Sequence, residues 1–227
     1  MYDLVRGPLV WISIVVFVVG TVIQVARFYR LSRPKATMKI KPKAPSAGQA
    51  EKPPLLPTES FAYKLRMLKM TVLGVNPVMI VVTTVFHVTL VLTPFFVLGH
   101  NILLDLSWGL SLPSLAEAVT DALTVVVLLG GAYFLYRRLF VAKVRSITGA
   151  YDYVVLLIAT APFITGFLAY HHIFDYDAVV FLHMLAGEIM LMAIPFTKLV
   201  HMPFFFINRF AMIHENTFGT GGSRTWR

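Results

Sequence analysis

Histidine is the residue type on which the possible chemistry of this sequence depends. The 227-residue chain contains seven histidines and no cysteine. Disulfides, thiolate zinc sites, cysteine-bound iron–sulfur clusters and covalently attached c-type haem are therefore excluded. A neutral imidazole on a membrane helix is a common axial ligand of b-type haem. Two antiparallel helices, each with one histidine near either membrane face, would hold two haems stacked across a bilayer.

The first candidate pair is His183 and His201. These residues are 18 positions apart, which is five whole turns of an ideal helix. On one continuous helix both side chains would project from the same face, about 27 Å apart along the axis. The spacing predicts two ligands near opposite membrane faces.

The second candidate pair is His87 and His100, 13 residues apart. An ideal helix would place them about 140° apart, but Pro94 between them can kink the helix. For His100, a position in an outer surface loop is the alternative. His171 and His172 are interpreted as surface or partner-contact residues, and as substitute ligands if His100 does not bind haem.

Five apolar segments must position these histidines. The chain is 57% hydrophobic and only 14% charged, with a mean hydropathy of +0.74. Segments of about 18 to 20 apolar residues are long enough to cross a bilayer. They cover residues 8–28, 77–98, 118–136, 153–170 and 178–206. The sequence therefore predicts an all-α integral membrane protein with a five-helix bundle. Pro195 and Pro203 are expected to kink the last helix or to end its apolar part early.

Loop charge predicts the orientation of these helices. Residues 27–70 carry eleven Lys/Arg and two acids, whereas the loops after the second and fourth segments carry acids and no Lys or Arg. The positive-inside rule then places the N-terminus outside and the C-terminus in the cytoplasm. The net charge of +9 is explained by this distribution, and no nucleic acid is expected as a partner.

The predicted organisation has four parts. Residues 1–28 form a first transmembrane helix, retained as an anchor, and 29–74 form a basic Pro/Lys-rich cytoplasmic arm. Residues 75–206 form a four-helix haem-binding membrane region, and 207–227 a cytoplasmic tail. The arm is either a solvated linker or a docking segment for an acidic partner or anionic lipid.

Glu188 is the one acid well inside an apolar segment. It follows His183 by five residues, so it should point about 140° away from that ligand. An intramembrane carboxyl is a candidate for function. A proton relay and a contact to a neighbouring subunit are the functional readings, and a protonated acid bonded to a backbone or Thr partner is the structural one.

Four cationic side chains are candidate contacts for haem propionates, because guanidinium groups bind carboxylates well. The positive-inside charge bias explains them equally well. These residues are Arg137, Arg138, Arg145 and Lys198.

Two stretches resemble a known family. RRLFVAKVRSITGAYDY at 137–153 and LHMLAGEIMLMAIPFTKLVH at 182–201 are similar to the gamma subunit of respiratory nitrate reductase. They resemble most the membrane cytochrome b subunits of sulfate-reducer redox complexes, such as the high-molecular-weight cytochrome complex. The likeness includes Phe86-His87, Gly187 and the 18-residue histidine spacing, and it covers about residues 75–210.

The resemblance implies two b haems, each held by two histidines. His100 would pair with His183 near the outer face, and His87 with His201 near the cytoplasm. It also implies an electron-transfer subunit of the bacterial inner membrane, active in anaerobic respiration and without a complete active site alone. Its implied partners are other membrane subunits, a periplasmic multihaem cytochrome c and a cytoplasmic iron–sulfur protein.

Two other functions remain open at this stage. One is a quinol-oxidising or quinone-reducing subunit with a menaquinone pocket beside a haem, although no lysine stands near Ala116 and Glu117, where the nitrate reductase subunit has one. The other is a transporter or assembly scaffold that uses its histidines for protons or packing. The histidine pairs and the resemblance of the fifth segment favour the haem subunit.

Overall fold

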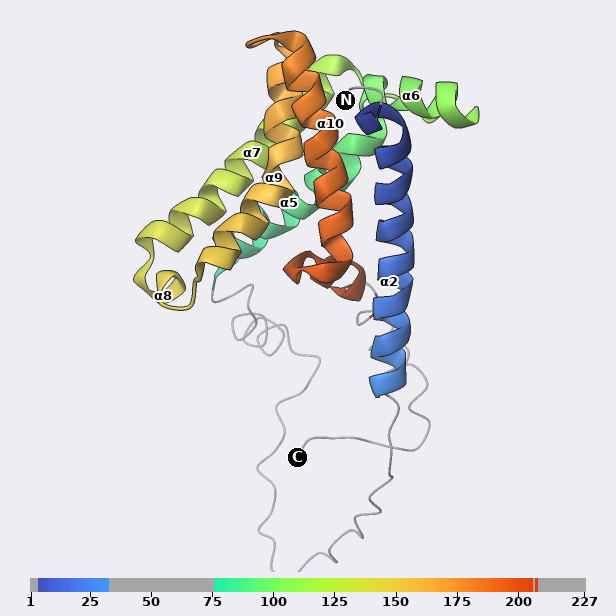
Figure 1. Cartoon of the computed structure of the whole chain (residues 1–227). Helices are drawn as coiled ribbons and strands as arrows, with labels where there is room; N and C mark the ends of the chain where they lie inside the picture. Colours follow the sequence, from blue (N-terminus) through green and yellow to red (C-terminus); the bar gives the residue numbers. More distant parts are fainter. Residues whose placement is uncertain (1–3, 33–75, 206, 208–227) are drawn as a thin grey trace, which may run out of the picture. The chain divides into compact units, whose positions relative to one another are not determined.

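The computed structural model describes residues 4–32, 76–205 and 207. It is built from helices, and the described residues contain no β-strand. The elements are drawn in Figure 1 and occur in the following order: the π-helix η1 (Val5–Leu9), α2 (Val10–Ser32), α5 (Pro77–Phe96), α6 (Leu98–Trp108), α7 (Glu117–Phe140), α8 (Ala142–Arg145), α9 (Ala150–Tyr170), α10 (Tyr176–Ala193), and the 3-10 turns η2 (Ile194–Phe196) and η3 (Lys198–Val200).

Five helical segments among the described residues are long and apolar enough to cross a membrane, which confirms the predicted fold class. Their bounds are Val5–Leu31, Pro77–Phe96, Glu117–Phe140, Ala150–Tyr170 and Tyr176–Phe196. Large apolar side chains are widely exposed on them, as expected for helices that face lipid. The predicted basic arm at 29–74 and tail at 207–227 lie almost entirely outside the described residues.

The chain divides into two compact units. The first, called unit 1, comprises residues 1–33 and 131–227, and the second, unit 2, comprises residues 34–130. The boundary falls within α7, so the first part of this helix belongs to unit 2 and its last part to unit 1.

In unit 1, α10 packs along α9 on one side and along α2 on the other (Figure 1). A β-carbon at Gly20 of α2 would stand 2.8 Å from the Pro195 ring. The Gln24 amide donates a hydrogen bond to the Pro195 carbonyl at 2.9 Å. Four residues further on, the rings of Phe28 and Phe204 lie 5.2 Å apart. These contacts run in the same order along both segments, and Figure 1 shows α2 and α10 running in the same direction.

In unit 2, the second span ends sooner than the sequence predicts. Val97 has an extended backbone with ψ 126°, which separates α5 from α6. The expected kink near Pro94 is therefore a complete break at Val97, three residues after Pro94, and His100 lies on the separate helix α6. The loop after α6 returns to this break, where the Leu115 amide donates to the Phe96 carbonyl at 3.0 Å.

The last span also ends sooner than predicted. Helix α10 stops at Ala193, and Thr197 is extended (φ −119°, ψ −175°) between two short 3-10 turns. Pro195 explains the end, because it lacks an N–H donor and its ring disfavours a continuing helix. The prediction that His183 and His201 share one face of a continuous helix is therefore wrong.

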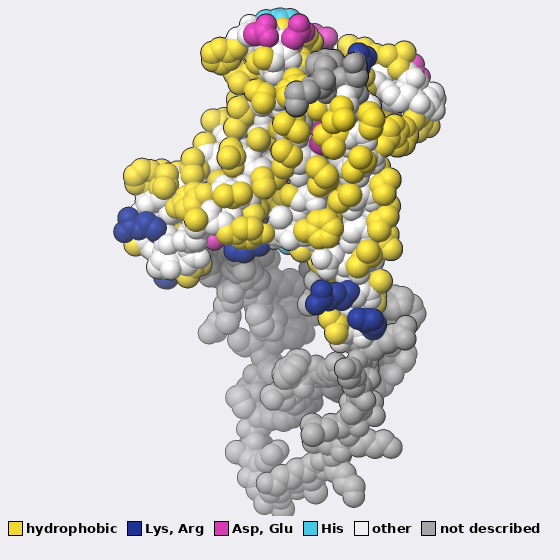
Figure 2. All heavy atoms as spheres, viewed as in Figure 1, with side chains coloured by type: hydrophobic (Ala, Val, Ile, Leu, Met, Phe, Trp, Pro, Cys, Tyr) yellow, Lys and Arg dark blue, Asp and Glu magenta, His cyan; other side chains and the backbone are white. Residues whose placement is uncertain are grey.

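The two ends of unit 1 differ in charge. The contacts of α2, α9 and α10 bring three basic segments to one end of unit 1. These are the end of α2 with Arg27 and Arg30, the α7–α9 connection, and Lys198. Asp175 and Asp177 lie at the opposite end, in the turn between α9 and α10. Figure 2 shows this distribution, with dark-blue side chains at α8 and at the end of α2 and magenta side chains at the α9–α10 turn.

Candidate functional site

His183 is held in the interface between α10 and α9. Its Nδ1 lies 2.9 Å from the Pro162 carbonyl and 3.3 Å from the Thr165 hydroxyl. A β-carbon at Gly166 would stand 3.0 Å from His183 Cε1, so the ring lies directly against the α9 backbone. Pro162, Thr165 and Gly166 fix the orientation of the imidazole. They were not predicted, because the residue types of APFITG within an apolar span do not indicate partners of an imidazole.

His100 is oriented by the break between α5 and α6. Its Nδ1 lies 2.8 Å from the Pro94 carbonyl. The last four carbonyls of a helix have no intrahelical partner, and Pro94 is within the last four residues of α5. The break that removes His100 from α5 thus also supplies the acceptor for its ring.

His87 takes a more local partner. Its Nδ1 lies 2.7 Å from the Thr83 carbonyl, one helical turn earlier on α5. The neighbouring Phe86 ring meets the imidazole edge to face at 5.3 Å. A β-carbon at Gly130 of α7 would stand 2.6 Å from this phenylalanine, so Phe86 is itself confined within unit 2.

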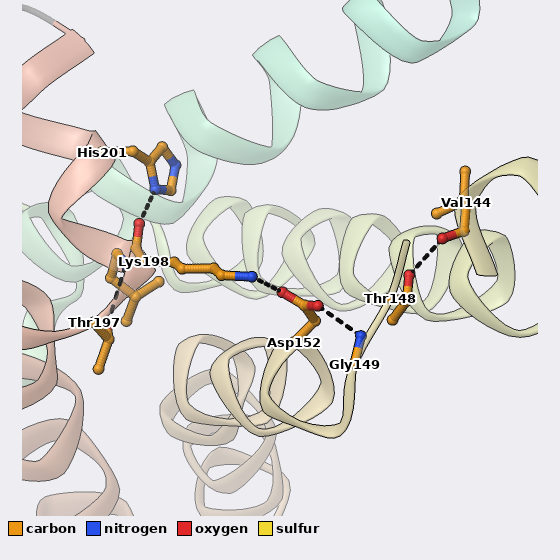
Figure 3. A network of polar contacts seen from close by, with 8 residues as sticks. Val144, Thr148, Gly149, Asp152, Thr197, Lys198 and His201 are labelled. Atoms are coloured by element: carbon orange, nitrogen blue, oxygen red, sulfur yellow. Dashed lines mark hydrogen bonds and ion pairs between the residues drawn. The ribbon is translucent and has the colours of Figure 1, made fainter. Parts of the chain in front are cut away.

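His201 lies just after the 3-10 turn η3, at the basic end of unit 1. Its Nδ1 lies 2.6 Å from the Lys198 carbonyl. Figure 3 shows the polar network around it: the Lys198 ammonium pairs with Asp152 at 2.5 Å, and the same carboxylate accepts the Gly149 amide at 2.9 Å. Lys198 therefore joins the His201 backbone segment to the start of α9.

The four candidate ligands share one feature. Each has its Nδ1 at hydrogen-bond distance from a backbone carbonyl, although the four carbonyls come from four different local structures. A carbonyl oxygen only accepts, so Nδ1 is the donor in each of these contacts. A metal-bound histidine usually has this kind of partner on the nitrogen that does not bind the metal. These residues fit axial ligands of haem iron.

Among the described residues, no group of three or more His, Asp or Glu side chains is placed to hold a metal ion.

His171 and His172 have different surroundings. The His171 ring lies against Phe167 and Tyr170, at 4.3 and 5.0 Å between centroids. His172 has a positive φ of 52° and lies 5.1 Å from the Tyr176 ring. Both belong to the turn after α9, where ring packing surrounds them.

The candidate propionate contacts have partners within the protein. Lys198 pairs with Asp152, and the Arg137 guanidinium lies 5.9 Å above the Tyr133 ring. Arg138 is 3.4 Å from the Phe134 carbonyl. Arg145 ends the short helix α8. All four are at the basic end of unit 1, the same end as His201.

Glu188 is buried, with 4% of its surface exposed. Among the described residues, neither of its carboxyl oxygens has a hydrogen-bond partner. The expected backbone or Thr partner is therefore not found in that part of the chain.

The described residues form a helical protein with five segments long and apolar enough to cross a membrane. A curated protein of Nitratidesulfovibrio vulgaris strain Hildenborough is 33% identical to this chain over 228 positions, covering 98% of this chain and 96% of the relative. The chain belongs to the same family as that protein. The relative is named only "Protein", which conveys no function, and no family model matches the chain.

Proposed function

We propose that this protein is a haem b subunit of a membrane redox complex and carries electrons across the bacterial inner membrane. Two b haems would be held by His87, His100, His183 and His201. The observation that carries this proposal is the hydrogen bond from each Nδ1 to a backbone carbonyl, the partner that metal-bound histidines usually have on their second nitrogen. Haem iron accepts and releases single electrons, and this is the chemistry that the bound group would supply.

The protein's own contribution is to fix the ligand rings. Pro162 and Thr165 hold the His183 ring from a neighbouring helix, and Gly166 provides the space for it. Such second-shell contacts fix the tautomer and raise the basicity of the ligand. The helix break at Val97 orients the His100 ring in a similar way, because it leaves the Pro94 carbonyl to accept a hydrogen bond from Nδ1.

Charge supports the proposed orientation. The basic end of unit 1 would face the cytoplasm and the acidic α9–α10 turn the periplasm. Arg138 and Arg145 would then be near enough to the cytoplasmic haem to serve as propionate contacts. Lys198 would have to exchange its Asp152 partner for a propionate.

The resemblance of residues 137–153 and 182–201 to the membrane cytochrome b subunits supplies the partners in this proposal. A periplasmic multihaem cytochrome c would exchange electrons with the outer haem, and a cytoplasmic iron–sulfur protein with the inner one. A quinol, such as menaquinol, would be the donor in the alternative function.

Haem content tests the proposal directly. Purified full-length protein should give the pyridine haemochrome of b haem at two haems per chain, and a reduced-minus-oxidised spectrum with two components. Substituting His87, His100, His183 or His201 by Ala should each remove one component, whereas His171→Ala should retain both. Protein without b haem would overturn the proposal.

Two further outcomes refine the ligand set and the donor. Loss of a haem in His171→Ala, with both haems retained in His100→Ala, would assign the outer ligand to His171. Rapid reduction of the isolated subunit by a quinol analogue, blocked by a quinone-site inhibitor, would favour the quinol-oxidising function.

A further inference from the structure

The buried carboxyl of Glu188 is not used by the proposed haem ligation. It lies on α10 near the middle of the span Tyr176–Phe196, and 4% of its surface is exposed. Within the described residues, both oxygens lack a hydrogen-bond partner. An intramembrane acid in such surroundings is costly to keep charged and marks a functional site.

The parallel packing of α2 and α10 shows which part of α2 stands opposite Glu188. Gly20 meets Pro195 just past the end of α10, and the residue seven positions before each lies about two helical turns back along the segment. These residues are Ser13 on α2 and Glu188 on α10. Ser13 is completely buried and donates its hydroxyl to the Val10 carbonyl at 2.7 Å. The carboxyl therefore lies at the level of a small, buried hydroxyl residue.

Few charged groups lie on the elements that pack against α10. In α2, residues 10–26 contain no titratable side chain, and neither do residues 154–169 of α9. Arg6 of η1 is exposed to the surroundings. On α10 itself, His183 is the titratable neighbour within the membrane, five residues and about 7.5 Å of helix rise away.

We propose that Glu188 binds a proton when the haem held by His183 is reduced, so that electron transfer through this protein is coupled to proton uptake. This inference depends on the proposed haem ligation by His183. A haem held by His183 would carry one more positive charge when oxidised than when reduced, and that charge would stabilise the Glu188 carboxylate through a medium of low dielectric constant. Once the haem was reduced, the carboxylate would lose that stabilisation and bind a proton.

The step is balanced in charge and atoms. For each electron that the donor, a quinol or a cytochrome c, would pass to the haem, one proton from the aqueous phase would convert the Glu188 carboxylate to a carboxylic acid. On reoxidation the electron and the proton would both leave, so the carboxyl O–H would be the only covalent bond formed or broken.

Redox titrations of the haem-loaded full-length protein over a range of pH test this coupling. The midpoint potential of one b haem should fall as the pH rises, because the reduced state binds the additional proton. Glu188→Gln should retain two haems and lose that pH dependence. Asp177→Asn, which changes an exposed acid on the same helix, should keep it.

Infrared difference spectra of the wild-type protein provide a readout that needs no variant. Reduction should produce the carbonyl band of a protonated carboxylic acid, shifted in heavy water and lost in Glu188→Gln. If the protein binds two haems whose potentials do not depend on pH and reduction produces no such band, the proposed coupling is wrong but the proposed function stands. Protein without haem would overturn the proposed function and the coupling together.

Discussion

The imidazole of His183 lies against Gly166, at a point where a β-carbon would approach His183 Cε1 to 3.0 Å and Nδ1 to 3.2 Å. The same ring is tied to the Pro162 carbonyl at 2.9 Å, so it has little freedom to withdraw. A single methyl group at position 166 would therefore disturb a proposed ligand without changing it.

Gly166→Ala should lower the haem content from two per chain toward one. The added methyl group forces the ring from its hydrogen bond, and such overpacking costs about 1–3 kcal/mol. The pyridine haemochrome measures the content. Gly187→Ala is the matched control, since no atom lies within 4 Å of a β-carbon there. Equal haem content in both variants would show that the Gly166 contact does not control His183.

Thr165→Val should raise the midpoint potential of one haem while both haems remain. The Thr165 hydroxyl donates to the Ala161 carbonyl at 2.8 Å and stands 3.3 Å from His183 Nδ1. Its oxygen can thus accept from Nδ1–H and make the imidazole a stronger donor to iron. The rise should not exceed about 60 mV, which corresponds to about 1.4 kcal/mol for one electron.

Redox titration of Thr165→Ser provides the control for that shift. Serine keeps the hydroxyl and should keep the wild-type potential. A potential that moves equally in the Val and Ser variants would mean that the methyl group of Thr165, through packing, was responsible.

Lys198→Met should leave both haems in place and lower stability only slightly. His201 takes its hydrogen bond from the Lys198 backbone carbonyl, which any side chain retains. The Lys198 side chain is 62% exposed, so its ion pair with Asp152 should contribute less than about 1 kcal/mol and weaken as salt rises. Thermal unfolding at low and high salt, together with haem content, measures both effects. Loss of a haem would instead indicate that the ammonium group acts on the haem itself.

Gly20→Ala should destabilise the packing of α2 on α10. The new methyl group would meet the Pro195 ring at 2.8 Å, and forced overpacking of this kind costs about 1–3 kcal/mol. Unfolding of the purified protein in mixed detergent micelles measures the loss. Gly7→Ala, at a position with open space around it, should not show it. The expectation fails if the two variants unfold alike.

Much of this architecture follows from hydropathy alone. A span such as residues 153–170 is recognisable because a helix of about twenty apolar residues is as long as the bilayer is thick. This match does not depend on the neighbouring helices. The predicted start at 153 was three residues late, because Asp152 and the residues before it are polar enough to resemble a loop but still extend α9.

The helix ends within the membrane were harder to predict. Pro94 and Pro195 were recognised as possible kinks, but a kink and a complete end differ only in whether other groups satisfy the released backbone. The Leu115 amide donates a hydrogen bond to the released carbonyl of Phe96, and the Gln24 side chain donates one to that of Pro195. Such partners are remote in sequence, so the sequence near Pro195 does not show that the helix ends there. The 18-residue spacing of His183 and His201 therefore resembles that of one continuous helix, although α10 ends between them.

The individual histidines were recognisable because polar residues in apolar spans are rare. Their ring partners were not recognisable in the same way. Pro162 contributes to the His183 site through its carbonyl, which every residue possesses, and Gly166 contributes through the absence of a side chain. Neither contribution leaves a signal in residue type.

The hydrogen bond from Gln24 to Pro195 joins residues 171 positions apart. During synthesis, α2 enters the membrane before any of the other spans, and its partner α10 emerges last. Until then the Gln24 amide has no Pro195 carbonyl to bind. Helix α2 thus gains its packing partner only after α10 has been synthesised. If synthesis stops before α10, the released chain lacks the helix against which α2 packs.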